Sequence, residues 1–117
     1  MARYCLVGHV SPAHLDEYRK RHAAVWPELL IALRDAGWRN YSLFLRPDGM
    51  LIGYCEADDL DDAQRRIGTT EVNARWQAEM SRLFTAEGAP DQAWERVEEV
   101  FNLEDQLATA ERAPEQG

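Results

Sequence analysis

The sequence predicts an α+β domain of the ferredoxin-like, split β-α-β type, in which helices cover one face of a four-stranded antiparallel sheet. Two observations carry this prediction. Apolar residues alternate in short segments, and between those segments they recur every three to four residues. The segments follow one another in the order β-α-β-β-α-β. We expect one domain over residues 1–103 and a polar C-terminal tail over residues 104–117.

The first predicted strand covers Arg3–Val10 and has apolar residues on both faces, which is typical of a central strand. A Ser-Pro pair then favours the start of a helix. Residues 13–36 carry an apolar stripe of helical period. Pro27 lies inside this stripe and has no backbone donor, so we expect a kink or break near Trp26.

The middle of the chain predicts a hairpin followed by two helices. Strands over Trp38–Leu45 and Met50–Ala57 flank a Pro-Asp-Gly turn at residues 47–49. Helices are expected over about residues 58–68 and 69–83, with aspartate and threonine residues as their N-caps. In a ferredoxin-like sheet, the first and third of the predicted strands lie side by side.

The last predicted elements are a loop over Thr85–Gln92 and a strand over Trp94–Leu103. The tail that follows is rich in Ala, Glu and Gln, and we expect it to be frayed or weakly helical. Helices on one side leave the other sheet face uncovered. We therefore expect a homodimer, in which a second copy of the chain covers that face.

Charge, hydropathy and cysteine content limit the classes of partner and indicate the cellular compartment. Twenty-one acidic and 13 basic residues give a net charge of −8, which argues against a nucleic acid or an anionic membrane as the partner. The longest apolar run, Leu29–Leu33, is far too short to span a bilayer, and no export signal is visible. Cys5 and Cys55 lack CxxC spacing, so we expect free thiols and a cytoplasmic location.

Known cofactor and metal motifs are absent from the sequence. It contains no GxGxxG, P-loop, HExxH or GxSxG pattern. His14 and His22 are eight residues apart, about two helical turns, and do not form a metal triad with His9. We therefore expect neither a metal nor a cofactor.

An aromatic cluster around one histidine is the candidate site. Tyr18, His22 and Trp26 follow one another at i, i+4 spacing and would share one helix face. Tyr41 and Trp76 could reach the same space. A histidine among aromatic walls can transfer protons near neutral pH, and aromatic faces suit the C–H face of a sugar. By spacing alone, such a stripe more often belongs to a core.

The segment YRKRHAAVWPEL, over Tyr18–Leu29, resembles the L-rhamnose mutarotase family in its pattern of Tyr, His and Trp-Pro-Glu-Leu. The resemblance continues at NYSLFL, EVNARWQAEM and EVFNL and covers about residues 3–103. It implies a dimeric α/β barrel. It also implies an isomerase that interconverts the α and β pyranose anomers of L-rhamnose, or of a related sugar, without a cofactor.

The resemblance also implies roles for individual residues. His22 matches the proton donor. The expected sugar-binding residues are Tyr18, Tyr41, Trp76, Gln77 and Trp26. The family usually has a second Trp where this chain has Gln77, and its NPDNSP-like loop is replaced here by EGAPDQAW. Both departures concern sugar contacts, so they bear on which sugar is bound.

Mutarotation needs one proton delivered to the ring oxygen and one removed from the anomeric hydroxyl. His22 can supply the acid, whereas Tyr18, a backbone carbonyl or an ordered water could be the base. Glu28 is expected to brace its helix. Two other functions fit the same scaffold: a cofactor-independent monooxygenase or isomerase of the dimeric α/β barrel type, and a non-enzymatic small-ligand-binding domain.

Overall fold

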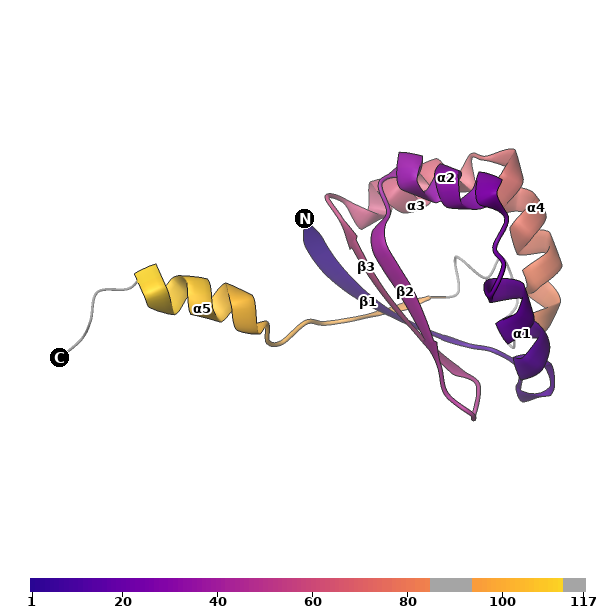
Figure 1. The fold of residues 1–117 in the computed structure, drawn as a ribbon, viewed down its shortest axis with the longest axis horizontal. Coiled ribbons are helices and arrows are strands. Elements are labelled where there is room, and N and C mark those ends of the chain that lie inside the picture. Colours follow the sequence, from indigo (N-terminus) through magenta and orange to yellow (C-terminus); the bar gives the residue numbers. More distant parts are fainter. Residues whose placement is uncertain (85–93, 113–117) are drawn as a thin grey trace.

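A computed structural model describes residues 1–84 and 94–112 and contains a four-stranded antiparallel sheet with the order β2-β3-β1-β4 (Figure 1). The strands are β1 (Ala2–His9), β2 (Arg39–Leu45), β3 (Met50–Ala57) and β4 (Glu95–Val97). This is the predicted ferredoxin-like order. β1 is central, between β3 and β4, as its two apolar faces indicated.

The turn between β2 and β3 requires a glycine. Gly49 has a φ of +96°, which residues with a Cβ rarely adopt. A Cβ at this position would also collide with the carbonyl oxygen of Val10. Beyond this turn, β3 pairs with β1 along its whole length, from His9 opposite Met50 to Ala2 opposite Ala57.

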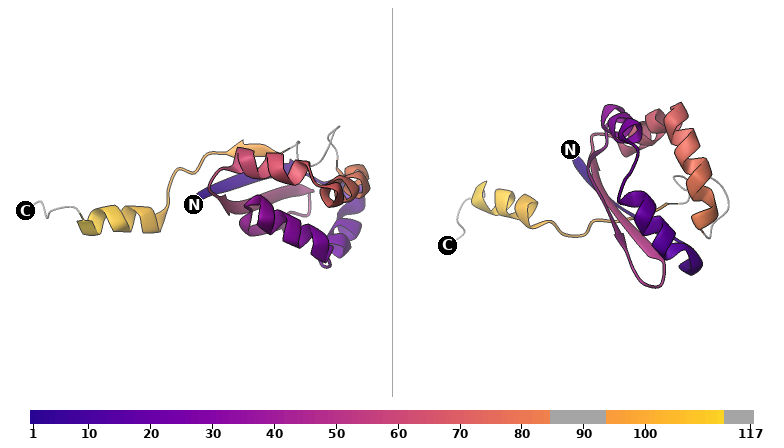
Figure 2. Two further views of the ribbon diagram at one scale, coloured as in Figure 1. Left: turned by 90° about the horizontal axis from the view of Figure 1, so that it is seen from above. Right: turned by 45° about the vertical axis from the view of Figure 1, so that its right-hand side comes forward.

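The helices of the domain lie on one side of the sheet (Figure 2). They are α1 (Leu15–His22), α2 (Pro27–Ala36), α3 (Leu60–Gly68) and α4 (Glu71–Met80), with short 3-10 turns at Pro12–His14 and Ser81–Leu83. Asp59 caps α3 and Thr70 caps α4 by accepting hydrogen bonds from backbone N–H groups. Both caps are among the predicted ones.

The predicted break at Pro27 is confirmed, and it divides the expected helix into two. α1 ends at His22 and Pro27 occupies the first turn of α2, where its missing N–H is not needed. Trp26 therefore lies in the connection and not on the helix of Tyr18. The expectation that Tyr18, His22 and Trp26 share one helix face is wrong on this point.

The two faces of the sheet have different surroundings. On the helix side, the core is formed by buried residues that include Leu6, Leu51 and Cys55, each 0% exposed. The other face, here called the open face, carries apolar side chains that include Phe44, 58% exposed, and Val97, 49% exposed.

Cys5 and Cys55 are both free thiols although their strands are adjacent. Cys5 lies opposite Tyr54, and Cys55 lies opposite Tyr4. Since side chains alternate along a strand, this one-residue offset places the two sulfurs on opposite faces of the sheet.

The last strand is shorter than predicted. β4 ends at Val97 instead of continuing to Leu103. Two consecutive glutamates, Glu98 and Glu99, interrupt the alternation that a half-buried strand needs. The chain then leaves the sheet, and α5 (Leu103–Arg112) extends away from the domain (Figure 1).

The predicted loop over Thr85–Gln92 lies outside the described residues. Among the helices that are described, none is long and apolar enough to cross a membrane.

Candidate functional site

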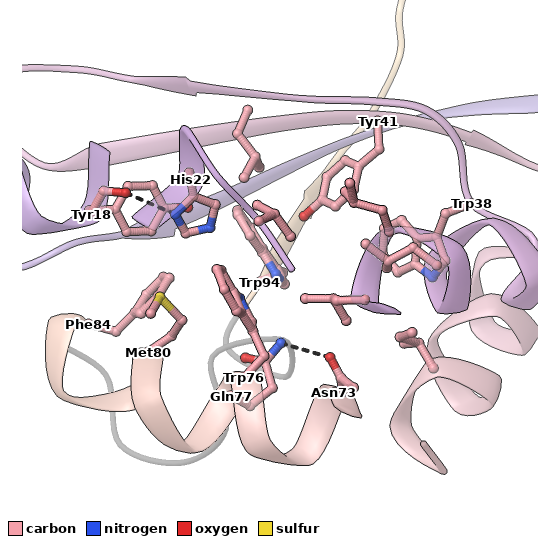
Figure 3. A pocket seen from close by; sticks show the side chains of 16 residues that line it. Tyr18, His22, Trp38, Tyr41, Asn73, Trp76, Gln77, Met80, Phe84 and Trp94 are labelled. Atoms are coloured by element: carbon pink, nitrogen blue, oxygen red, sulfur yellow. Dashed lines mark hydrogen bonds between the residues drawn. The ribbon is translucent and has the colours of Figure 1, made fainter. Parts of the chain in front are cut away.

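A cavity of about 330 Å³ lies between the sheet and the helices (Figure 3). His22, Tyr18, Tyr41, Trp76 and Gln77 line it, whereas Trp26 does not. The described lining residues include no Asp, Glu, Lys or Arg. The cavity therefore combines aromatic and aliphatic walls with a few uncharged polar groups, which suits a neutral polar ligand.

Tyr18 and His22 are placed by helix geometry. They are one turn apart on α1, and their rings stack with centroids 4.0 Å apart and an interplanar angle of 21°. The Nδ1 atom of His22 lies 3.0 Å from the carbonyl oxygen of Tyr18 (Figure 3). A carbonyl oxygen only accepts hydrogen bonds, so Nδ1 donates its proton to it. In neutral His22, Nε2 is therefore the nitrogen without a proton.

Burial sets the protonation states of this pair. It lowers the pKa of His22 below its ordinary value of 6.5, and the hydrogen bond to the Tyr18 carbonyl opposes this change only in part. Burial also raises the pKa of the Tyr18 phenol, and the neighbouring Tyr41 raises it further. At neutral pH the site therefore presents a neutral imidazole beside a protonated phenol.

Trp76 forms a wall of the cavity and is supported from behind by Trp26. Trp76 is 5% exposed, and its ring meets that of His22 edge-on at 5.4 Å. Trp26 packs edge-on against Trp76 at 5.0 Å. Arg75 lies over Trp26 at 5.9 Å and pairs with Glu28 at 3.5 Å, which connects α4 to α2.

An amide pair on α4 contributes polar groups to the wall. Gln77 Nε2 donates a hydrogen bond of 3.1 Å to Asn73 Oδ1 (Figure 3). Asn73 is only 5% exposed, and its backbone N–H donates to the capping hydroxyl of Thr70. The sequence prediction did not include Asn73. Its position one turn before Gln77 was the available signal.

Trp94 is a second lining residue that the sequence did not reveal. It precedes β4, and its ring lies against Gly8 of β1, where an added Cβ would come within 3.2 Å of the ring. The missing side chain at Gly8 therefore makes room for Trp94. Trp38 also lines the cavity, and its indole N–H donates to the Ala63 carbonyl at 3.3 Å. Only the tertiary arrangement brings these tryptophans to the cavity.

Within residues 1–84 and 94–112, no group of three or more His, Cys, Asp or Glu side chains is close enough to hold a metal ion.

Comparison with known proteins gives one consistent family. The profile of the L-rhamnose mutarotase family matches residues 3–103. An L-rhamnose mutarotase from Burkholderia cenocepacia is 37% identical over 98 residues, which span 82% of this chain and 92% of the relative.

Solved structures agree with the sequence comparison. The crystal structure of an L-rhamnose mutarotase from Formosa agariphila aligns with a TM-score of 0.68 and 25% identity, covering 88% of this chain and 99% of that one. A type II polyketide cyclase from Streptomyces glaucescens, tetracenomycin F2 cyclase, aligns with a TM-score of 0.53 and 21% identity, covering 87% and 98% of the two chains. This chain and the cyclase therefore share only their fold.

Proposed function

The chain belongs to the L-rhamnose mutarotase family, as the YxxxHxxxWPE motif indicated, and we propose that its cavity binds L-rhamnose or a related sugar and exchanges its anomers. It is an isomerase that acts on carbohydrates. The two other functions considered from the sequence find no support in the comparisons.

The observation that carries the proposal is the position of neutral His22 in a cavity whose described lining is aromatic and uncharged. A pyranose has apolar C–H faces and hydroxyls around its edge. In the described lining, aromatic rings can pack on the C–H faces, and phenol and amide groups can hydrogen-bond the hydroxyls. A reaction that only moves protons needs a group that can be protonated and deprotonated near neutral pH. His22 is that group.

We infer that His22 carries a single proton between the two oxygens bonded to the anomeric carbon. In ring opening, unprotonated Nε2 accepts the proton of the anomeric hydroxyl, and that oxygen becomes the carbonyl oxygen. The C1–O5 bond breaks, and the imidazolium donates the same proton to O5. After the carbonyl turns, the reverse steps close the ring on its other face, so protons and electrons balance.

The base in this mechanism is Nε2 of His22. Tyr18 has a raised pKa and stays protonated, which makes its phenolate a poor base. His22 acts first as the base and then as the proton donor that the family resemblance implies. Tyr18 and Tyr41 are proposed to hydrogen-bond the sugar hydroxyls, Trp76 to stack on the ring, and Gln77 to contact its edge. Trp26 contributes by supporting Trp76 and not by touching the sugar.

Saturation-transfer NMR between the two anomeric protons of a free sugar tests the reaction. We expect micromolar protein to accelerate exchange for L-rhamnose or for a related 6-deoxy sugar or pentose. A panel of such sugars then ranks the substrates. No acceleration with any of them, from protein whose melting transition shows that it is folded, would contradict the proposal.

We also propose a homodimer formed through the open face. The support is its exposed apolar surface, which includes Phe44 and Val97 at 58% and 49% exposure. Sedimentation or light scattering checks this, since a stable monomer of 13.4 kDa would contradict it. A cytoplasmic location is proposed as well, because both cysteines are free thiols, as expected in a reducing compartment.

A further inference from the structure

The segment after β4 carries apolar side chains that the other described parts of the protomer leave exposed. We call residues 98–112 the C-terminal arm. Its exposed apolar residues are Val100 (85%), Phe101 (61%), Leu103 (54%) and Leu107 (41%). Beyond Leu103, the arm lies outside the region that matches the family. The part of the arm beyond Leu103 is therefore a feature of this chain that the family match does not cover.

Ion pairs with β1 fix the orientation of the arm. The guanidinium of Arg3 donates hydrogen bonds to the carboxylates of Glu99, at 2.9 Å, and of Asp105. At 100° per residue, Asp105 lies roughly opposite Leu103 and Leu107 on α5. Since Asp105 faces its own protomer, the stripe formed by the two leucines faces away from it.

The length of α5 also argues that it has a packing partner. It has ten residues, and isolated helices shorter than about 12–15 residues are marginal in water. The long axis of the protomer measures 59 Å against 31 Å for the next, and Figure 1 shows α5 at the far end of that axis. The described elements of its own domain therefore do not supply the missing contact for the leucine stripe.

The position of the arm favours a second copy of this chain over any other partner. β4 runs directly into the arm, so Val97 of the open face and Val100 and Phe101 of the arm lie close together along the chain. A partner that covers the open face is thus already beside the arm. In a two-fold dimer each arm meets the same surface of the other protomer, and the contact closes without a third molecule.

We propose that the C-terminal arm of each protomer packs through Leu103 and Leu107 on a second copy of the chain and clamps the dimer. This inference rests on the homodimer proposed above. It adds a surface that holds the two copies together and that extends beyond Leu103, past the segment shared with the family.

Analytical ultracentrifugation over a dilution series tests the clamp with two matched variants. L103S/L107S removes the leucine stripe, whereas E104S/T109S places two serines elsewhere on the same helix. We expect the first to raise the dimer Kd about a hundredfold or more, since it removes two leucine contacts and each is worth about tenfold. The second should leave the Kd within about threefold. A chain ending at Asn102 should behave like L103S/L107S.

Equal Kd values for L103S/L107S and the unmodified chain would overturn the clamp, as would an unmodified chain that stays monomeric at high micromolar concentration. Melting curves confirm that each variant is folded. Anomer exchange, measured on the same samples, separates this inference from the enzymatic one. A weakened dimer without exchange in the unmodified protein would contradict only the proposed reaction, and normal exchange with an unchanged Kd would contradict only the clamp.

Discussion

The helix side of the sheet and its open face are built from the same strands, yet within one protomer only the helix side is covered by other described elements. On the helix side, Leu6, Leu51 and Cys55 are 0% exposed, and aromatic side chains that line the cavity contact one another ring to ring. On the open face, Phe44 and Val97 remain about half exposed, at 58% and 49%.

This difference separates two roles of apolar surface in one small domain. On the helix side it forms a core with a cavity whose few polar groups can select a ligand. On the open face it stays exposed, which is typical of surfaces that bind another molecule. Changes on the helix side should therefore alter catalysis within a protomer, and changes on the open face should alter the assembly of protomers.

The largest effect is expected from His22→Asn on the helix side. Asparagine keeps polarity and much of the volume but cannot carry the proton, so anomer exchange should fall about 10²–10⁴-fold. Sugar binding and melting temperature should change far less. Exchange and melting should be measured on the same sample, because a folded variant with nearly normal exchange would remove His22 from the mechanism.

Phe44→Asp tests the open face. A charge in a buried apolar interface is costly, so the dimer Kd should rise about a hundredfold or more. Ile31→Asp is the matched control, because Ile31 is 50% exposed but lies on α2, on the other side of the sheet. Sedimentation of both variants decides whether the open face is the interface; equal Kd values would mean that it is not.

The pH profile sharpens the role of His22. Unprotonated His22 starts the reaction, so the exchange rate should rise up to about tenfold per pH unit below its pKa and level off above it. Because burial lowers the pKa of His22, this plateau should begin below pH 6.5. The uncatalysed exchange of the sugar is subtracted at each pH. A rate that instead falls as pH rises through this range would indicate that imidazolium starts the reaction.

The smallest effect is expected at the amide pair. Asn73→Ala removes the acceptor that positions Gln77 Nε2, so KM should rise about 3- to 10-fold, the value of one hydrogen bond, with kcat nearly unchanged. Gln77→Ala and the double variant complete a double-mutant cycle. If the two residues act together, their effects on KM will not add, and additive effects would show that they act separately.

Local patterns in the sequence determined much of this protein. Periodicity predicted the order of strands and helices, and Pro27 predicted the break before α2, because both depend on neighbours along the chain. The pairing of Tyr18 with His22 was also predictable, since residues four apart meet on any helix. The motif around these residues further indicated the family.

Only the tertiary structure decided which other residues reach the cavity. Trp94 lies there because strand pairing brings it to Gly8, which has no side chain in the way. Trp26 does not line the cavity, because the break at Pro27 places it in the connection before α2, where its ring packs against Trp76. The sequence likewise did not predict that β4 ends at Val97 or in which direction α5 extends. Such features depend on contacts between segments far apart in the chain, and local periodicity carries no information about them.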